Sequence, residues 1–457
     1  MCGIFGIFPH KNAAELTSIG LYALQHRGEE ACGIVTRNTR RIHIHKGLGL
    51  VSDVFNEKII KSLSGEMALG HVRYSTTGNP NSKNIQPFYV KSKIGDIAIA
   101  HNGNITNALK LRKELEDNGA LFQTTMDSEI IVHLLVHSKE KEIKDKILWA
   151  TSKLEGAYSL ILMINDLLIG VRDPYGFRPL CLGNLDKAYV LTSETCVLDL
   201  IGANYIRDIE PGEVIFIYKD KIESFNIGRR EHFAFCIFEY IYFARPDSNI
   251  FGHNVYLVRK RLGKQLAKEF PVKKVDFVMP IPDSGTYAAL GFSQESKIPF
   301  EFGMIRNHYI GRTFIQPTQS LRDFRVKVKL NPLKEILKGK DIVIIEDSIV
   351  RGTTSRARVK TLRAAGAKKI HMRVSCPPLK FPCFYGIDFP TKKELIAHKY
   401  TIGWIKNFIG VDSLEYLSLK GMLSSMPLPQ QNFCTACFTG EYPTKIDLPV
   451  YKGILER

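Results

Sequence analysis

The chain has 457 residues, of which 44% are hydrophobic and 24% charged, and this composition is typical of a globular protein with two or three domains. It has no apolar run of about 18 residues and no basic N-terminal segment before an apolar core, so we predict neither a membrane span nor a secretory signal and expect a cytoplasmic protein. The formal net charge is +17, but the basic residues are dispersed, which favours a solvated surface over a nucleic-acid-binding one.

Residues 2 to about 230 contain short apolar runs bounded by turn residues, such as CGIFGIF, ACGIVTR, MALGHVRY, DIAIAHNG and YSLILMI. These runs predict β-strands, and helical patterns lie near 13–26, 107–118 and 127–138. Because several strands precede each helix, we expect antiparallel sheets with the helices packed outside them. The Asn165-Asp166 pair between two runs predicts a hairpin turn.

The pattern changes near 230–240, where we place a domain boundary. From residue 252 onward, expected helices at about 252–269, after Gly285, and from about Thr354 to Ala365 alternate with the apolar runs VDFVMPI, DIVIIED and KIHMRVS. Such alternation predicts βαβ units and a parallel sheet.

Cys2 is preceded only by Met1, so removal of Met1 would place a free α-amine beside the cysteine thiol. N-terminal-nucleophile hydrolases combine a nucleophile and a general base in this way. An α-amine has a pKa of about 7.7–8.0 and can act as a base near neutral pH. The small Gly3 is compatible with removal of Met1. A Met-Cys start also arises by chance, so the other segments must decide.

Residues 343–355, VIIEDSIVRGTTS, form the most specific segment of the chain. A buried strand ends in the acidic pair Glu346 and Asp347, and Gly352 then opens a helix that we expect Thr353 or Thr354 to cap. Backbone N–H groups at such a helix start can bind phosphate, and the acidic pair suits ribose hydroxyls or Mg²⁺.

The same segment resembles the phosphoribosyl pyrophosphate (PRPP) signature of the phosphoribosyltransferases. That family usually carries two aspartates at the acidic pair, whereas this chain has Glu346 first. The resemblance implies that PRPP contacts nine consecutive residues: Glu346, Asp347, Ser348, Ile349, Val350, Arg351, Gly352, Thr353 and Thr354.

Two other segments could complete this site. Residues 282–285 follow a strand at the edge where open α/β sheets bind ligands, so Ser284 could contact pyrophosphate or join Glu346 and Asp347 at Mg²⁺. The basic segment 306–316 would suit a mobile lid over pyrophosphate, with Tyr309 and Arg312 as its expected contacts. Alone, each segment would be an ordinary turn or surface strand.

Seven segments of the N-terminal half occur in the order typical of class II glutamine amidotransferase domains: CGIFG at Cys2, HRG at His26, HVRYSTTG at His71, HNGNITN at His101, TMDSE at Thr125, GAYS at Gly156 and RDPYGFRP at Arg172. With the PRPP signature, nearly the whole chain resembles the glutamine PRPP amidotransferases, which make 5-phosphoribosylamine in the first committed step of de novo purine synthesis. The resemblance implies an α+β N-terminal-nucleophile glutaminase domain of four αββα layers over 2–230. It further implies an α/β type I phosphoribosyltransferase domain with a parallel sheet and a C-terminal cluster-binding segment over 235–457.

The resemblance also assigns roles within the glutaminase. Cys2 would attack the glutamine amide and form a thioester, while its α-amine carries the proton to the departing ammonia. The Asn102 side chain and the Gly103 N–H would bind the oxyanion. Arg73 would bind the glutamine α-carboxylate and Asp127 its α-ammonium. The glutamine-binding set would be Arg27, Arg73, Thr76 and Asp127. Ammonia would then reach C1 of PRPP through an internal passage that the lid helps to form, and pyrophosphate would leave.

The chain has nine cysteines, of which eight besides Cys2 remain to be explained, and we expect no disulfide framework. Cys434-Thr-Ala-Cys437, with Cys236 and Cys383, could bind zinc or an iron–sulfur cluster. One branch of the resembling family carries a [4Fe–4S] cluster on matching cysteines. That branch often has a propeptide, whereas here we expect loss of Met1 alone to mature the chain. The other four, Cys32, Cys181, Cys196 and Cys376, lie in apolar runs and are expected to be packing residues.

The resemblance finally implies one Mg²⁺ per subunit, glutamine and PRPP as substrates, purine nucleotides as inhibitors and a homotetramer. Two alternatives stay open. One is a PRPP-sensing purine regulator, although no DNA-reading segment is visible in the sequence. The other is a class II amidotransferase with a different acceptor, against which the segment 343–355 argues.

Overall fold

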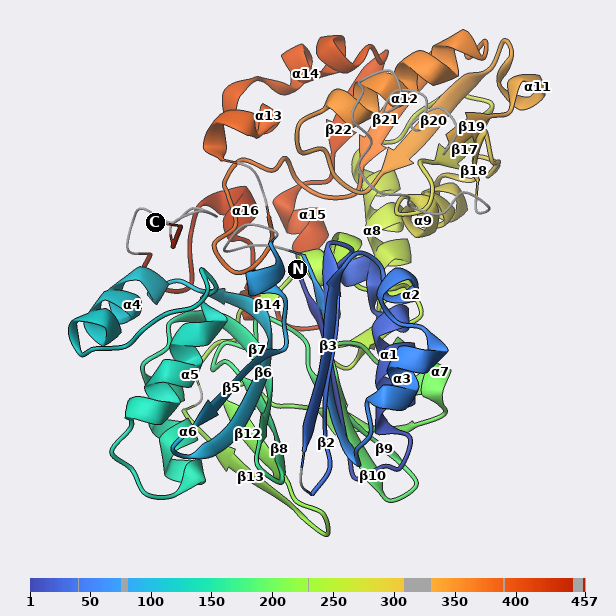
Figure 1. Cartoon of the computed structure of the whole chain (residues 1–457). Helices are drawn as coiled ribbons and strands as arrows, with labels where there is room; N and C mark the ends of the chain where they lie inside the picture. The colour runs from blue at the N-terminus through green and yellow to red at the C-terminus, as the bar shows by residue number, and fades with distance from the viewer. Residues whose placement is uncertain are drawn as a thin grey trace.

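The structure is a computed structural model that describes residues 1–39, 41–74, 81–228, 230–307, 330–388, 391–446 and 455–456. Figure 1 shows two lobes, a lower one built from the blue and green N-terminal half and an upper one in yellow, orange and red. Among the described residues, no helix is long and apolar enough to cross a membrane.

The lower lobe contains two stacked antiparallel sheets. Within the described residues, one sheet has seven strands in the order β11-β9-β10-β1-β4-β2-β3, and the other has six in the order β13-β12-β8-β7-β6-β5. Their bounds are β1 Gly3–Phe8, β2 Ala31–Arg37, β3 Ile42–Leu48, β4 Met67–Arg73, β5 Phe88–Ser92, β6 Gly95–Ile105, β7 Gly156–Ile164, β8 Leu167–Arg172, β9 Cys181–Leu185, β10 Ala188–Thr192, β11 Asn204–Asp208, β12 Glu213–Ile217 and β13 Ile222–Asn226. A buried aliphatic core fills the space between the sheets, with Ile4, Ala100 and Ile161 among its members.

Helices cover the two outer faces of this sheet pair (Figure 1). On the seven-stranded sheet pack α1 Ala13–Ala23, α2 Val51–Val54, α3 Glu57–Ser62 and α7 Cys196–Ile201. On the six-stranded sheet pack α4 Ala108–Asp117, α5 Ser128–His137 and α6 Ile143–Ser152. Two short 3-10 turns, η1 Gln25–Arg27 and η2 Ser82–Asn84, complete the lobe. The four-layer αββα arrangement is therefore confirmed, as is the hairpin between β7 and β8, where Asn165 takes a φ of 50°.

The upper lobe is built on a parallel sheet in the order β17-β20-β21-β22. Its strands are β17 Phe277–Pro280, β20 Asp341–Glu346, β21 Lys369–Val374 and β22 Ser413–Tyr416, and its longer helices are α8 Val255–Glu269, α9 Thr286–Ser296, α12 Thr353–Ala364 and α14 Ile402–Ile409. This confirms the predicted parallel sheet and the helix before β17, after Gly285 and after β20.

Shorter elements fill the rest of the upper lobe. They are β14 Phe235–Cys236, the π-helical turn η3 Glu239–Phe243, β15 Asn249–Ile250, β16 His253–Asn254, β18 Met304–Arg306, β19 Leu330–Pro332, α11 Lys334–Leu337, η4 Lys392–Glu394, α13 Ile396–Lys399, α15 Leu419–Ser424, η5 Gln430–Asn432, β23 Phe433–Cys434 and α16 Ala436–Thr439.

The two lobes are in close contact. Tyr385 stacks on Phe177 with ring centroids 4.2 Å apart, and Asn104 of β6 donates to the Phe384 carbonyl over 3.0 Å. Leu455, near the end of the chain, is buried in the hydrophobic cluster that the six-stranded sheet forms with α4, α5 and α6. C-terminal residues thus help to build the surroundings of the N-terminal lobe.

Candidate active site

Cys2 lies directly before β1, which runs between β10 and β4 in the seven-stranded sheet. Its backbone N–H donates to Oδ1 of Asn102 over 3.2 Å, and its thiol donates to the Tyr74 carbonyl over 3.5 Å. The next residue must be small, because a Cβ on Gly3 would lie 2.8 Å from the Val72 side chain. The close packing of β1 against β4 therefore fixes the position of the thiol.

Asn102 and Gly103 lie in β6, across from Cys2. Asn102 is fully buried, yet its Nδ2 has no hydrogen-bond partner among the described residues. A buried amide nitrogen without a partner is unusual in a protein and suggests a donor kept for a ligand. At Gly103, a Cβ would lie 2.0 Å from the Ala157 carbonyl oxygen of β7, so only glycine fits there. The structure thus brings the two predicted oxyanion donors to the same strand beside Cys2.

Arg73 and Asp127 are both buried, at the end of β4 and immediately before α5. Burial lowers the pKa of Arg73, while the nearby charges of Cys2, Glu30 and Asp127 oppose this effect. Burial would raise the pKa of Asp127, but His101, 3.6 Å away, and the N–H of Ile105, at 2.9 Å, outweigh it and lower that pKa. The predicted carboxylate and ammonium ligands therefore share one electrostatic neighbourhood with Cys2.

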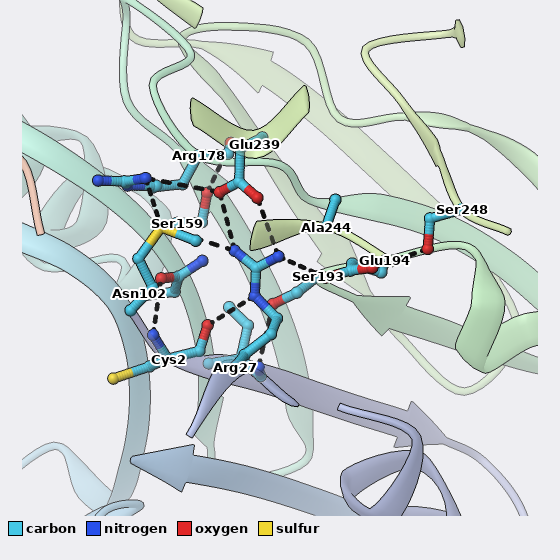
Figure 2. Close-up of polar contacts among 12 residues, drawn as sticks. Cys2, Arg27, Asn102, Ser159, Arg178, Ser193, Glu194, Glu239, Ala244 and Ser248 are labelled. Atoms are coloured by element: carbon cyan, nitrogen blue, oxygen red, sulfur yellow. Dashed lines mark hydrogen bonds and ion pairs between the residues drawn. The ribbon is translucent and has the colours of Figure 1, made fainter. Parts of the chain in front are cut away.

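Arg27 lies behind Cys2. Its Nε donates to the Cys2 carbonyl over 3.0 Å, and its other two nitrogens donate to Glu194 and Glu239 (Figure 2). Each nitrogen of the guanidinium thus already has a protein partner. Thr76, the other residue expected near glutamine, lies outside the described residues.

Sequence reasoning missed three charged residues of this site: Arg178, Glu194 and Glu239. All three are buried and make ion pairs with one another or with Arg27. A signal was present, because Glu239 stands alone in the apolar run CIFEYIYF and Glu194 in VLTSETCVL. A lone acidic residue in such a run is seldom buried without a cationic partner.

The two segments expected to bind PRPP meet at one edge of the parallel sheet. β17 pairs with β20 in parallel, with Pro280 opposite Ile345, so residues 282–285 and 346–352 leave the sheet side by side. A Cβ on Gly285 would lie only 2.3 Å from the Ile345 carbonyl oxygen. This close approach holds half-buried Ser284 near the acidic pair.

Within the acidic pair, Glu346 accepts from Nη1 of Arg358 over 2.8 Å, and Asp347 accepts from the Ser348 hydroxyl over 2.5 Å. Burial raises the pKa of Glu346 to about 8; Arg358 opposes this rise and Asp347 adds to it. The glutamate side chain at position 346 thus forms an ion pair with Arg358 of α12.

The predicted cap of α12 is wrong. The N-cap residue is Gly352, with a φ of 74° that favours glycine, and no side chain caps this helix. The side chains of Thr353 and Thr354 are exposed instead, and so is that of Arg351, which pairs with Glu394 over 2.9 Å. Tyr309 and Arg312 of the expected lid lie outside the described residues.

All nine cysteines lie in described segments and none forms a disulfide. The four expected metal ligands, Cys236, Cys383, Cys434 and Cys437, line one cavity. The other residues that line it are Phe177, Ile237, Phe238, Tyr385, Ile387 and Ala436. The N–H of Tyr385 donates to the Cys383 sulfur over 3.3 Å. The other four cysteines are buried as predicted, and burial raises the pKa of Cys32 to about 12.

Comparison with known proteins gives a consistent result. A family profile described as a glutamine amidotransferase domain matches residues 71–199. A protein of Methanocaldococcus jannaschii named amidophosphoribosyltransferase is 50% identical over 99% of this chain and 100% of its own length. A Synechococcus elongatus protein of the same name is 48% identical, with 97% and 92% of the two chains covered.

Two solved structures are similar over their whole length. One, described as the allosteric regulatory enzyme of purine biosynthesis, superposes with a TM-score of 0.94 at 44% identity, covering 100% of this chain and 99% of the other. The second, a glutamine PRPP amidotransferase from B. subtilis complexed with ADP and GMP, has a TM-score of 0.93 at 44% identity and covers 99% of both chains.

Proposed function

The chain belongs to the amidophosphoribosyltransferase family, and from this premise we propose that Cys2 is its nucleophile for glutamine hydrolysis once Met1 has been removed. The enzyme transfers ammonia from glutamine to C1 of PRPP and yields 5-phosphoribosylamine, glutamate and pyrophosphate. One observation carries the residue assignment: the buried Asn102 accepts the Cys2 N–H with its oxygen and leaves its nitrogen unpaired among the described residues.

The glutaminase step follows from these positions. In the mature chain the α-amine of Cys2 takes the place of the present amide, so it can donate to Asn102 Oδ1 and still offer its lone pair to the thiol proton. The thiolate attacks the amide carbon, and the oxyanion is stabilised by Nδ2 of Asn102 and the N–H of Gly103. The protonated α-amine then gives its proton to the amide nitrogen, the C–N bond breaks, and ammonia leaves behind a thioester, which water hydrolyses to glutamate.

Substrate binding uses a cation and an anion. We assign the glutamine α-carboxylate to Arg73, whose guanidinium can bind it in a bidentate manner, and the α-ammonium to Asp127, whose lowered pKa keeps it charged. Thr76 remains a proposed neighbour. Arg27 is assigned to the support of Cys2 rather than to direct glutamine contact, because its nitrogens already have partners.

The PRPP site is proposed at the edge where β17 and β20 end. The backbone N–H groups at Gly352 and the start of α12 suit the 5-phosphate, and the acidic pair suits the ribose hydroxyls. We propose the nine residues from Glu346 to Thr354 as PRPP contacts, with Tyr309 and Arg312 of the lid on pyrophosphate. Carboxylates with a hydroxyl are hard oxygen ligands, so Glu346, Asp347 and Ser284 fit Mg²⁺, which would neutralise pyrophosphate charge.

Two tyrosines, Tyr74 and Tyr242, support the proposal of an internal passage for ammonia. The Cys2 thiol contacts the carbonyl of Tyr74. Partial burial raises the pKa of Tyr242, and the charges of Asp347 and Tyr74 add to this rise, so Tyr242 lies within electrostatic range of both residues. Ammonia released at Cys2 would therefore travel beside these two tyrosines.

The four-cysteine cavity is proposed to hold a [4Fe–4S] cluster. Its walls are apolar, and three sulfurs receive backbone N–H groups, Cys383 from Tyr385, Cys236 from Phe238 and Cys434 from Ala436. Iron–sulfur clusters are bound by four thiolates and tuned by such N–H···S contacts.

We propose a glutaminase domain over 2–230 and a phosphoribosyltransferase domain over 235–457. Purine nucleotides are proposed as inhibitors, since a structural relative was solved with ADP and GMP. A homotetramer and a cytoplasmic location complete the proposal.

The proposal is tested with PRPP-dependent glutamine hydrolysis and ammonia-dependent phosphoribosylamine formation, measured on the parent enzyme and on Cys2→Ala. We expect Cys2→Ala to lose the first activity and to keep the second. Glutamate release that survives in Cys2→Ala would show that another group is the nucleophile.

A further inference from the structure

We propose that Glu239, a residue of the upper lobe, positions the glutaminase nucleophile of the lower lobe by holding Arg27 on the Cys2 carbonyl. The inference rests on the proposed role of Cys2. It adds a positioning residue to the reaction, because Glu239 reaches Cys2 only through Arg27.

Glu239 is fully buried and bridges two guanidinium groups. Its Oε1 accepts from Nη2 of Arg27 over 2.8 Å and lies 3.5 Å from Nη1 of Arg178, and its Oε2 accepts from Nη1 of Arg27 over 3.0 Å (Figure 2). A carboxylate that accepts two bonds from one guanidinium fixes the plane of that group. Glu239 therefore determines the direction in which Nε of Arg27 points.

Nε of Arg27 points at the nucleophile residue. It donates to the Cys2 carbonyl over 3.0 Å, and Glu194 accepts from the same guanidinium on another side. The carbonyl of residue 2 belongs to the peptide that follows the Cys2 Cα, so a fixed carbonyl limits the rotation of the nucleophile residue. Arg27 thus holds the backbone of Cys2 in place, and Arg27 itself is held by Glu194 of the lower lobe and Glu239 of the upper lobe.

The charges in this cluster are balanced. Arg27 and Arg178 face Glu194 and Glu239, and all four side chains are shielded from solvent. Burial would raise the pKa of Glu194, but His26 and Arg27 outweigh it and hold that pKa well below its usual range. Removal of one carboxylate would leave a buried positive charge without a partner, which is costly in a protein interior.

Glu239 has a place in the fold that connects the two sites. It begins the π-helical turn η3, and Tyr242 of the same turn is near enough to Asp347 of the acidic pair for that charge to act on it. π-helical turns are rare and are frequent at functional sites. One turn of the upper lobe therefore contacts the support of Cys2 through Glu239 and carries Tyr242 within electrostatic range of the proposed PRPP site.

The first test is Glu239→Gln, which preserves size and removes the charge. We expect kcat for glutamine hydrolysis to fall about 10- to 100-fold, since a small misplacement of a reacting group has this effect. KM for glutamine should change less than about threefold, because Arg73 and Asp127 are separate from Glu239. Glu239→Asp, which restores the charge on a shorter side chain, should recover part of the lost kcat.

Thr195→Val is the matched control. Thr195 is buried at the same contact between lobes and accepts the N–H of Asn249 over 2.8 Å, but it belongs to neither site. We expect this variant to keep the parent kcat and KM. Ammonia-dependent synthesis should stay near the parent value in Glu239→Gln and Thr195→Val alike.

The results separate the possible failures. Unchanged kcat in Glu239→Gln, or an equal loss in Thr195→Val, would overturn the positioning role of Glu239. A matching loss of ammonia-dependent synthesis would point to general damage and would also overturn it. If Glu239→Gln folds poorly, Glu239→Asp provides the same comparison. Glutamine hydrolysis that survives Cys2→Ala would instead contradict the proposed function itself.

Discussion

The side-chain amide of Asn102 faces Cys2, and its oxygen and its nitrogen are in different states. Its oxygen accepts the Cys2 N–H over 3.2 Å, and its buried nitrogen has no partner in the described ranges. In the proposed mechanism the first contact would hold the α-amine of mature Cys2, and the nitrogen would offer its N–H to the oxyanion. One residue can therefore orient the base and stabilise the transition state.

Asn102→Asp separates these two tasks, because aspartate keeps the acceptor for Cys2 and loses the donor. We expect kcat for glutamine hydrolysis to fall by about 10²–10³-fold, the usual effect of removing one oxyanion donor. Ammonia-dependent synthesis should be unaffected. Steady-state kinetics with each nitrogen source check this, with Asn184→Asp on β9 as a control that should behave like the parent. Normal glutaminase activity in Asn102→Asp would remove Asn102 from the oxyanion site.

Met1 is nearly inaccessible in the folded chain, with 1% of its surface exposed. Its sulfur contacts Arg178, and burial lowers the pKa of its α-amine to about 5. An aminopeptidase could not reach this residue without opening the structure, so we expect Met1 to be removed before the lobes close.

Protein that is produced while methionine aminopeptidase is inhibited should therefore keep Met1 and lack glutaminase activity. Added aminopeptidase should leave the folded protein intact and remove Met1 only when it acts on the unfolded chain, as intact mass would show. Rapid removal of Met1 from the folded protein would contradict the prediction. Ammonia-dependent synthesis is the internal control, since it does not require a free Cys2 amine.

Much of the fold was predictable because it depends on local patterns. Alternating apolar runs located the strands, Asn165 marked a hairpin, and the strand–acidic pair–glycine order located the edge of the parallel sheet. The contacts of Arg27 were not predictable. Glu239 is 212 positions away from it in the sequence, and nothing local shows which buried carboxylate meets which guanidinium. The cap of α12 was mispredicted because Gly352 adopts positive φ and leaves both threonines exposed.

Glu346 should make stability depend on pH in magnesium-free buffer. Burial raises its pKa to about 8, whereas a glutamate of the unfolded chain titrates near about 4.3. Between these values the folded protein keeps a proton that the unfolded chain has released, so this contribution to the free energy of unfolding falls as the pH rises. The free energy of unfolding should fall through this residue by at most about 1.4 kcal/mol for each pH unit.

Glu346→Gln cannot titrate and should become more stable relative to the parent as the pH is raised from about 5.5 to about 8. Urea denaturation at both pH values, without PRPP, measures this change. Glu415→Gln, half-buried on β22, should show no comparable pH-dependent gain over the parent. A constant difference between Glu346→Gln and the parent would mean that Glu346 is ionised throughout this range.

The four-cysteine cavity joins three stretches of the upper lobe, since Cys236 of β14 lies opposite Cys434 of the parallel strand β23 and Cys383 lies in the loop between β21 and η4. A bound cluster would fasten these stretches together, so its loss should lower thermal stability. Anaerobically purified parent should contain iron and acid-labile sulfide in equal amounts. Cys236→Ser should lose both and melt at a lower temperature, whereas Cys32→Ser, buried outside the cavity, should keep the full iron content. Zinc without sulfide in the parent would exclude the cluster and leave the same four thiolates as a zinc site.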